Sequence, residues 1–393
     1  MTISTSIIRE DAEQIVDDLS GPLAALKGTT LLVTGASGFL CSHFLETIAV
    51  VNESARPGCR VLAVDNFQTG LPERLSWIQG RPDMELRQCD ASQPLDPEEP
   101  VDWIIHGASI ASPPVYRQFP LETIDVNVNG TRHMLDLLRH GGGSGMLLLS
   151  SSEIYGDPDP ANIPTAEDYR GLVSSTGPRA CYDESKRLAE TLAMTYYRLY
   201  GAPVKIIRPF NVYGPGQRLD DGRIVPTLIS AAFHRQPIVL YSDGRATRSF
   251  CYVRDAIQGM LLVLLSSAAG EAFNVGNDEE VSIGEVARIA AGLNGPPDLP
   301  IHFEVSVERD YLCDNPQRRC PDLTKLKRLG QWEPRVKVRE GLARTLQSYR
   351  GADCGADSQS AAPRLVSALG RGARKTRIET SLDPAGTSAC ATG

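Results

Sequence analysis

Short apolar runs alternate with longer stretches of helical spacing between residues 29 and 208. The stretches between the runs place apolar side chains three or four residues apart, and strands that alternate with helices favour a parallel sheet covered by helices. The pattern therefore predicts an α/β fold with a doubly wound parallel sheet. The runs with the length and composition of buried strands are Thr29–Val33, Arg60–Val64, Asp102–Ile105, Met146–Ser150 and Val204–Ile207.

The pattern changes on both sides of this region. Residues 7–19 are compatible with a short acidic amphipathic helix packed on the main domain. Past Pro209, short elements and loops rich in Gly, Pro and Asp favour a smaller C-terminal α/β domain that binds the substrate. The chain is thus interpreted as a helical extension (1–28), a dinucleotide domain (29–208, to which 249–275 returns), a mainly substrate-binding domain (209–350) and a tail (351–393) expected to be disordered.

Composition narrows the class of protein. A net charge of −8 provides no excess of basic residues for nucleic acid, and the longest apolar runs are too short to cross a bilayer. The 9 cysteines form no C-x-x-C pair, so neither a metal site nor a disulfide framework is expected. A cytoplasmic enzyme without metal, nucleic-acid partner or membrane segment is the simplest interpretation.

A glycine turn follows the first predicted strand. Gly35 and Gly38 allow a tight turn and a close approach of the backbone to a pyrophosphate, and the helix that begins at Phe39 and Leu40 directs its amide groups there. Asp65 ends the next strand, where it can accept hydrogen bonds from an adenosine ribose and repel a 2′-phosphate, so NAD is favoured over NADP. The sheet is therefore predicted to be of the Rossmann type. Cys41 replaces the third glycine of this fingerprint and is expected to loosen the packing of helix on strand without abolishing binding.

Tyr182 and Lys186 lie four residues apart in the predicted helix 179–200, hence on one face. An ammonium group beside a tyrosine stabilises the phenolate and lowers the pKa of the phenol. Such a pair can take a proton from a sugar hydroxyl while a dinucleotide takes the hydride. The serine-rich strand end at Ser150–Ser152 supports this interpretation.

At these motifs the chain resembles the extended short-chain dehydrogenase/reductase family, which acts on nucleotide sugars. The resemblance covers roughly Lys27 to Tyr349. It is carried by the segments Val33–Phe39, Val64–Phe67, Thr69–Gly70, His106–Ser109, Ser151–Gly156, Tyr182–Lys186 and Arg208–Pro215.

The resemblance implies roles for individual residues. Ser151 would hydrogen-bond the substrate oxygen beside Tyr182. The cofactor would be held by Gly35, Ser37, Gly38, Phe39, Leu40, Asp65, Asn66, Asp90, Ala108, Ser150, Tyr182 and Lys186. The nucleotide sugar would contact Ser112, Tyr116, Asn211, Arg223, Tyr241, Arg248 and Arg319.

Three residues discriminate between the reactions of this family. By resemblance, 4,6-dehydratases place an acidic residue where this chain has Ser152, and 4-epimerases place a small or hydroxylated residue where it has Glu153. The order Ser-Ser-Glu-Ile-Tyr-Gly resembles the UDP-glucuronate decarboxylases. Segments 111–116, 177–184 and 314–322 also resemble them, and the last contains Arg319, which would face the sugar.

The resemblance therefore implies an NAD-dependent decarboxylation of UDP-glucuronate. Oxidation at C4 creates a β-keto acid, which loses carbon dioxide to give UDP-xylose, a UDP-4-keto-pentose, or both. Ser151, Glu153, Tyr182, Lys186 and Arg319 would be the catalytic residues. A 4-epimerase or 4,6-dehydratase of the same family is the alternative. The helices around 124–138 and 182–200 resemble those that pair family members into homodimers.

Overall fold

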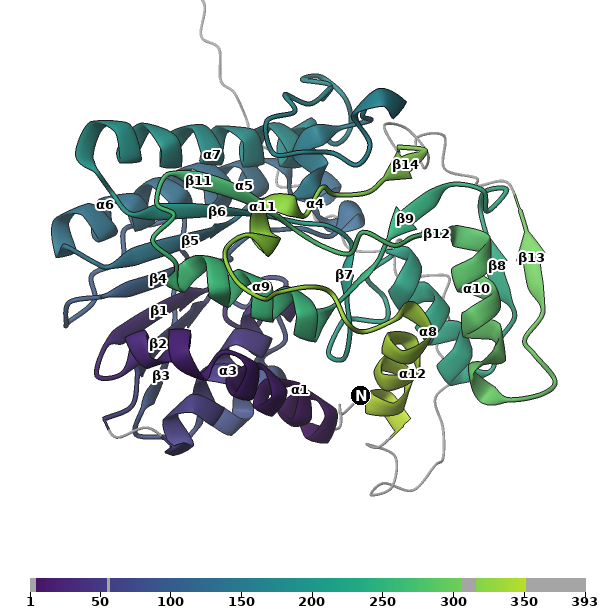
Figure 1. The fold of residues 1–393 in the computed structure, drawn as a ribbon, viewed down its shortest axis with the longest axis horizontal. Helices are drawn as coiled ribbons and strands as arrows, with labels where there is room; N and C mark the ends of the chain where they lie inside the picture. The colour runs from purple at the N-terminus through teal and green to yellow at the C-terminus, as the bar shows by residue number, and fades with distance from the viewer. Residues whose placement is uncertain (1–4, 55–56, 305–315, 351–393) are drawn as a thin grey trace, which may run out of the picture. The chain divides into compact units, whose positions relative to one another are not determined.

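The computed structural model describes residues 5–54, 57–304 and 316–350, all of which lie in the first of two units, Met1–Cys354. The predicted tail, 351–393, lies outside the described residues, as do residues 314 and 315 of the segment 314–322. The first unit is built on a seven-stranded parallel sheet with the strand order β11-β6-β5-β4-β1-β2-β3 (Figure 1). These strands are β1 (Thr30–Thr34), β2 (Arg60–Asp65), β3 (Met84–Gln88), β4 (Trp103–His106), β5 (Gly145–Leu149), β6 (Val204–Pro209) and β11 (Glu271–Val275).

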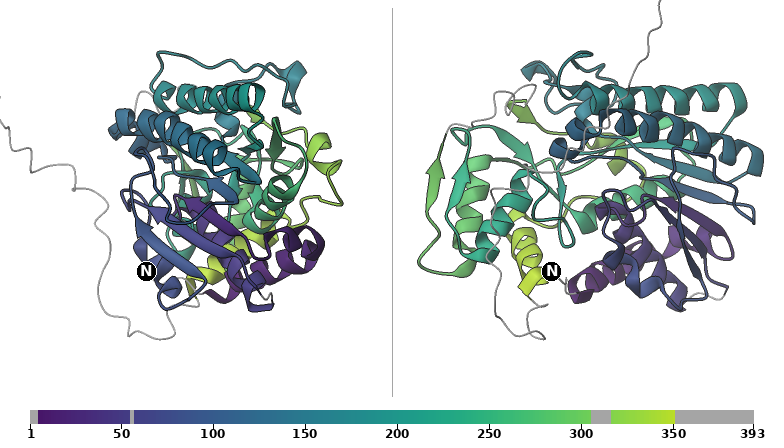
Figure 2. Two further views of the ribbon diagram at one scale, coloured as in Figure 1. Left: turned by 90° about the vertical axis from the view of Figure 1, so that its left-hand side faces the viewer. Right: turned by 180° about the vertical axis from the view of Figure 1, so that it is seen from behind.

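Alternate residues of the strands point to opposite faces of the sheet and enter two separate cores. Leu31 and Val33 belong to one cluster of buried residues, whereas Leu32 between them belongs to the other. Helices α3 (Phe39–Ser54) and α9 (Val253–Leu265) cover the first face. Helices α6 (Thr131–Gly141) and α7 (Ala180–Tyr200) cover the second face, as Figure 1 and the right-hand view of Figure 2 show.

The remaining elements form a smaller region beside the carboxyl ends of the strands (Figure 1). Three short sheets pair β10 with β7, β9 with both β12 and β14, and β13 with β8. The strands are β7 (Val212–Tyr213), β8 (Ile238–Leu240), β9 (Thr247–Ser249), β10 (Cys251–Tyr252), β12 (Glu280–Ser282), β13 (Ile301–Phe303) and β14 (Arg318–Arg319). Its helices are α8 (Ile224–His234), α10 (Ile283–Ala291) and α12 (Val338–Arg350). The predicted fold class, a Rossmann-type α/β fold, is confirmed.

Short helices connect these layers. They are α2 (Ser20–Leu23), α4 (Pro113–Gln118), α5 (Pro120–Asp125) and α11 (Thr324–Lys327), with the 3₁₀ turns η1 (Ala24–Leu26), η2 (Pro72–Ile78), η4 (Ser152–Tyr155), η5 (Pro160–Asn162) and η6 (Gly292–Asn294). A π-helical turn, η3 (Val126–Gly130), joins α5 to α6. No helix in the described ranges is long and apolar enough to cross a membrane.

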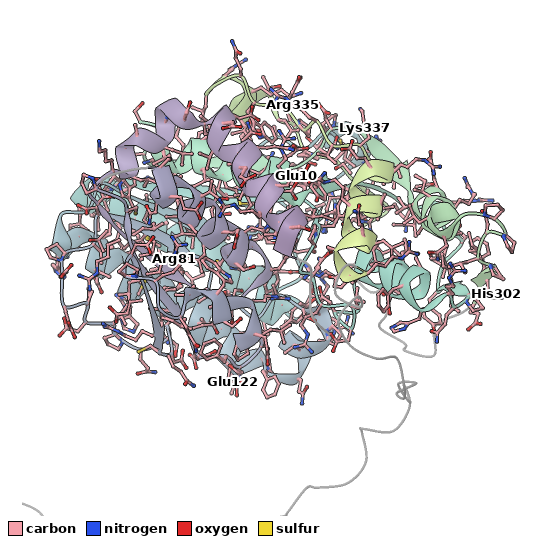
Figure 3. All side chains as sticks on the ribbon, turned by 90° about the horizontal axis from the view of Figure 1, so that it is seen from below. Glu10, Arg81, Glu122, His302, Arg335 and Lys337 are labelled. Atoms are coloured by element: carbon pink, nitrogen blue, oxygen red, sulfur yellow. The ribbon has the colours of Figure 1, made fainter. Side chains whose placement is uncertain are left out.

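The amphipathic helix expected near the N-terminus is α1 (Thr5–Asp18), which packs on α3, α9 and α12. Asp11 on its buried face is 1% exposed, accepts a hydrogen bond from the Tyr252 hydroxyl at 2.8 Å and forms an ion pair with Arg344 at 2.7 Å. Figure 3 shows Glu10 on the same helix, and Glu10 also pairs with Arg344, at 3.1 Å. Arg344 of α12 thus holds the first helix against the last.

Candidate active site

The turn Gly35–Gly38, called the cofactor turn below, joins β1 to α3. Gly35 has a φ of +69°, and a Cβ atom there would lie 2.7 Å from the Ala108 nitrogen, so glycine is required. The Ser37 amide donates to the Asp65 carboxylate at 2.8 Å. The Ser37 hydroxyl is buried without a hydrogen-bond partner among the described residues. A glycine turn at a helix N-terminus, with one hydroxyl left without a partner and a carboxylate at the end of the next strand, fits a dinucleotide.

Cys41 is tightly packed, because Gly107, at the end of the neighbouring strand β4, leaves space for the thiol. A Cβ atom on Gly107 would lie 2.3 Å from the Cys41 sulfur, so the thiol occupies the space that a side chain at residue 107 would need. The thiol also donates a weak hydrogen bond to the Thr34 carbonyl at 3.5 Å, and burial raises its pKa to about 12. Cys41 is 2% exposed and belongs to the core beneath α3. The expected loosening is therefore wrong: glycine at residue 107 compensates for cysteine at residue 41.

The other residues predicted to hold the cofactor lie near the carboxyl ends of β1–β5. Phe39 and Leu40 begin α3 and pack on its core. The Asn66 side chain accepts a hydrogen bond from the Gln68 amide. The carboxylate of the exposed Asp90 accepts one from the Ser92 amide, so both side chains stabilise local turns. The Ala108 amide contacts the Thr34 hydroxyl at 3.4 Å. The Ser150 hydroxyl donates to Glu190, a buried residue behind Lys186.

Tyr182 and Lys186 lie one turn apart on α7, both buried, at the end of β5. The Lys186 ammonium is 5.8 Å from the centre of the Tyr182 ring and donates to the Leu149 carbonyl at 2.8 Å, which fixes the lysine against the strand. Ser151 caps η4 by accepting from the Glu153 amide at 3.2 Å, and it hydrogen-bonds the Tyr182 side chain. The structure therefore brings the three predicted catalytic groups Ser151, Tyr182 and Lys186 together.

The expected lowering of the tyrosine pKa is wrong for the protein's own residues. Burial raises the pKa of Tyr182 to about 12 and outweighs the hydrogen bond of Ser151, which lowers it. Burial also lowers the pKa of Lys186 to about 8, although the field of Glu190 opposes this shift. Removal from water disfavours the charged form of each group, and it is the largest cause of both shifts.

Glu153 lies between two arginines that come from different elements. One of its oxygens accepts from Arg319 of β14 and the other from Arg179, at the start of α7. Burial alone would raise the pKa of Glu153, but the two guanidinium groups lower it to about 2. The Nε atom of Arg179 also lies 3.4 Å from the carboxylate of Asp183. We call Glu153, Arg179, Asp183 and Arg319 the charge cluster.

The sequence interpretation assigned no role to Arg179 or Asp183. Both lie in the segment 177–184, quoted for its resemblance, so the signal was present, but a motif does not show which side chains meet. Arg179 precedes Asp183 by one helical turn and therefore shares a face with it. The ion pairs of Arg179 with Glu153 and Asp183, and of Arg319 with Glu153, depend on the positions of η4 and β14 beside α7.

Tyr116, on α4, covers the catalytic tyrosine. Its ring stacks on that of Tyr182 with 5.2 Å between centres and 11° between planes, and its hydroxyl is buried without a partner in the described parts of the chain. Burial raises the pKa of Tyr116, which keeps the phenol neutral. The ring therefore forms an apolar wall with one polar atom beside the charge cluster.

The other predicted substrate contacts come from several separate elements. Arg223 precedes α8 and pairs with Asp221, and Ser112 donates to the Asp221 carbonyl. Asn211, with a φ of +42°, donates to the Ser249 carbonyl. Arg248 is 7% exposed, and burial, followed by the field of Arg319, lowers its pKa to about 10. Tyr241 is 40% exposed and follows β8.

A parallel sheet with a glycine turn after its first strand, and a Ser-Tyr-Lys group at its carboxyl edge, defines the class of dinucleotide-dependent short-chain oxidoreductases. The comparison with known families agrees. The chain belongs to the NAD dependent epimerase/dehydratase family, whose model matches residues 31–276.

The chain is similar to several curated decarboxylases. It is 40% identical over 324 residues to UDP-glucuronic acid decarboxylase 1 of Arabidopsis thaliana, an alignment that covers 82% of this chain and 70% of that protein. It is 39% identical over 320 residues to UDP-glucuronic acid decarboxylase 1 of Xenopus tropicalis, covering 81% and 72%. These identities place the chain among enzymes that modify nucleotide sugars.

Solved structures share its fold. UDP-glucuronic acid 4-epimerase from Bacillus cereus, solved with UDP-glucuronic acid and NAD, superposes with a TM-score of 0.69 at 23% identity, covering 82% of this chain and all (100%) of that one. UDP-glucose 4-epimerase from Thermotoga maritima gives a TM-score of 0.70 at 22% identity, covering 82% and 99%. At such identities the likeness shows the fold alone.

Proposed function

We propose that this protein is an NAD-dependent decarboxylase of UDP-glucuronate. The observation that carries the proposal is the placement of Glu153 between Arg179 and Arg319, beside Tyr182. Two guanidinium groups and an ionised glutamate at the sugar end of the site suit a substrate whose sugar carries a carboxylate. Ser152 and the 40% identity to a UDP-glucuronic acid decarboxylase support the same reaction.

NAD would be held at the cofactor turn and by Asp65. When bound, it would accept the hydride from C4 and return it at the end of the reaction, and its positively charged nicotinamide ring would favour the phenolate of Tyr182. Tyr182 takes the proton of the C4 hydroxyl, and Lys186 supports the resulting phenolate. The product is a ketone in the β position to the C6 carboxylate.

Loss of carbon dioxide then breaks the C5–C6 bond, and the electron pair forms an enolate at C4. Tyr182 and Ser151 hydrogen-bond the enolate oxygen and stabilise the charge that develops there. Arg319 and Glu153 orient the carboxylate before it leaves. C5 gains one proton, and reduction of the ketone gives UDP-xylose; release before reduction gives the UDP-4-keto-pentose.

Product analysis tests the proposal. Purified protein incubated with UDP-glucuronate and NAD should release carbon dioxide, and mass spectrometry should show a UDP-pentose or its 4-ketone. A product of unchanged mass would identify a 4-epimerase, and loss of water from dTDP-glucose a 4,6-dehydratase. Intact UDP-glucuronate after long incubation would contradict the proposal.

We also propose that the protein forms a homodimer through α5 and α7. These helices expose large apolar side chains to solvent, including Leu121 (71%), Leu188 (47%) and Leu199 (66%). Apolar groups on two adjacent helices favour burial against a second copy. Sedimentation equilibrium should give twice the chain mass, and Leu188→Glu should shift the protein toward the monomer; a monomeric wild type would contradict the proposal.

A further inference from the structure

Asp183 is the member of the charge cluster with the fewest partners. Its side chain is 8% exposed, and one carboxylate oxygen lies 3.4 Å from Arg179 Nε, a long distance for an ion pair. The other oxygen is buried and has no hydrogen-bond partner among the described residues. A buried carboxylate needs several strong donors to remain ionised, and Asp183 has one weak one.

Arg179 is shared between two carboxylates. A terminal nitrogen of Arg179 donates to one oxygen of Glu153, and Arg319 donates to the other. Only the Nε atom of Arg179 contacts Asp183. Glu153 therefore takes most of the positive charge available. With both carboxylates ionised, the charges of Arg179 and Arg319 are fully neutralised, and a further carboxylate would find only the neighbouring charge of Arg248, which lies in the field of Arg319 and Glu153.

We propose that Asp183 is a specificity-determining residue: it takes up a proton when a sugar carboxylate joins the guanidinium groups of Arg179 and Arg319, and it loses that proton when the carboxylate leaves. The inference rests on the proposed function. Protonation of Asp183 leaves one guanidinium charge for the substrate, whereas Glu153 stays ionised between its two arginines.

The surroundings of Asp183 support this exchange. Burial raises the pKa of its carboxyl group to about 7; Arg179 opposes the shift, Glu153 adds to it and Arg319 opposes it. Asp183 in turn raises the pKa of the buried tyrosines and of Cys181. The titratable and charged groups around Asp183 are Arg179, Cys181 and Tyr182 on α7, Tyr116 on α4, Glu153 on η4 and Arg319 on β14.

The proton count over one turnover closes. Substrate binding forms an O–H bond on Asp183 with a proton from solvent. Breaking the C5–C6 bond releases uncharged carbon dioxide and leaves its electron pair in the enolate. Asp183 loses its proton as C5 gains one, so one solvent proton is consumed, as replacement of a carboxylate by hydrogen requires.

The first test is the pH profile of KM in the full chain. For the wild type, KM for UDP-glucuronate should rise above neutral pH, by up to about tenfold per pH unit. Asp183→Asn should remove the rise, because an amide cannot ionise. Glu184→Gln is the matched control: it removes a charge from the next residue, whose side chain is 40% exposed, and should keep the wild-type profile. A rise that persists in Asp183→Asn would overturn the inference.

Calorimetry gives a second measurement that does not depend on turnover. UDP-glucuronate and UDP-xylose would be titrated into Tyr182→Phe near pH 7 in two buffers of different ionisation enthalpy. UDP-glucuronate should take up more protons than UDP-xylose, which has the same diphosphate but no carboxylate, and Tyr182→Phe/Asp183→Asn should abolish the difference. Equal uptake of protons by both ligands would overturn the inference even if the double variant fails to fold. A wild type that leaves UDP-glucuronate intact would instead contradict the proposed function.

Discussion

The cofactor turn and the charge cluster lie at opposite ends of one site and are built in different ways. The cofactor turn consists of neighbouring residues and backbone groups, with Asp65 28 residues away as its partner. The charge cluster consists of side-chain charges from three elements, and Arg319 meets Glu153 across 166 residues of chain. The first end is therefore fixed by local conformation and packing, whereas the second depends on the whole fold and on the balance of charge.

The largest effect is expected at Tyr182, where the two ends meet. Tyr182→Phe removes the group that exchanges the C4 proton, and decarboxylation should fall by about 10²–10⁴-fold. Carbon dioxide release measures this loss. NAD binding by calorimetry is the control and should persist, because the cofactor turn and Asp65 are intact in this variant. Activity close to that of the wild type would refute the role of Tyr182.

Arg319→Met tests the charge cluster. Glu153 would keep one guanidinium partner instead of two, so turnover should fall and the free energy of unfolding should decrease by about 3 kcal/mol, the low end for a broken buried pair. Denaturant unfolding and carbon dioxide release measure the two effects. Arg318→Met is the matched control, because the adjacent Arg318 pairs with Glu280 at the surface and contributes at most about 1 kcal/mol. Equal losses in both variants would contradict the comparison.

Acid should weaken the charge cluster through Glu153. Its pKa is about 2 in the folded protein against an ordinary value of 4.5, so its contribution to stability is present above pH 4.5 and is lost as the pH falls through about 2. The contribution is about 2–3 kcal/mol. Denaturant unfolding of wild type and Glu153→Gln should therefore converge as the pH falls from 4.5 to 2. A difference that stays constant over this range would disprove the assignment.

The smallest effect concerns packing beside the cofactor turn. Gly107→Ala would press a methyl group against the Cys41 sulfur and should cost about 1–2 kcal/mol of stability. Cys41→Gly should cost about 1 kcal/mol, and the double variant should recover most of the loss caused by alanine. Thermal unfolding of the four proteins measures this coupling. Additive losses would show that the two residues do not share space.

The sequence predicted the buried strands because their composition is decisive. Five apolar runs lie within one or two residues of β1, β2, β4, β5 and β6. Strand β3 was not predicted, because an edge strand needs few apolar residues: Met84 is its one buried position, and Leu86 is the one apolar residue that follows it in the strand. Such a strand is recognised only from its pairing with β2.

The site was predicted to the extent that its chemistry follows from spacing. Tyr182 and Lys186 occupy one face of a helix, and that follows from a separation of four residues. The meeting of Arg179 with Glu153 does not, because it depends on where η4 lies relative to α7. The direction of the tyrosine pKa could not be predicted either, because burial outweighs the neighbouring charge and burial is a property of the complete fold.

The contact between α1 and α12 has a consequence for the order of events during synthesis. Asp11 and Arg344 are separated by 333 residues, so α1 leaves the ribosome long before the arginine with which it forms its ion pair. Until then Asp11 and Tyr252 lack the cation that their buried positions require. Synthesis of α12 therefore closes this side of the molecule.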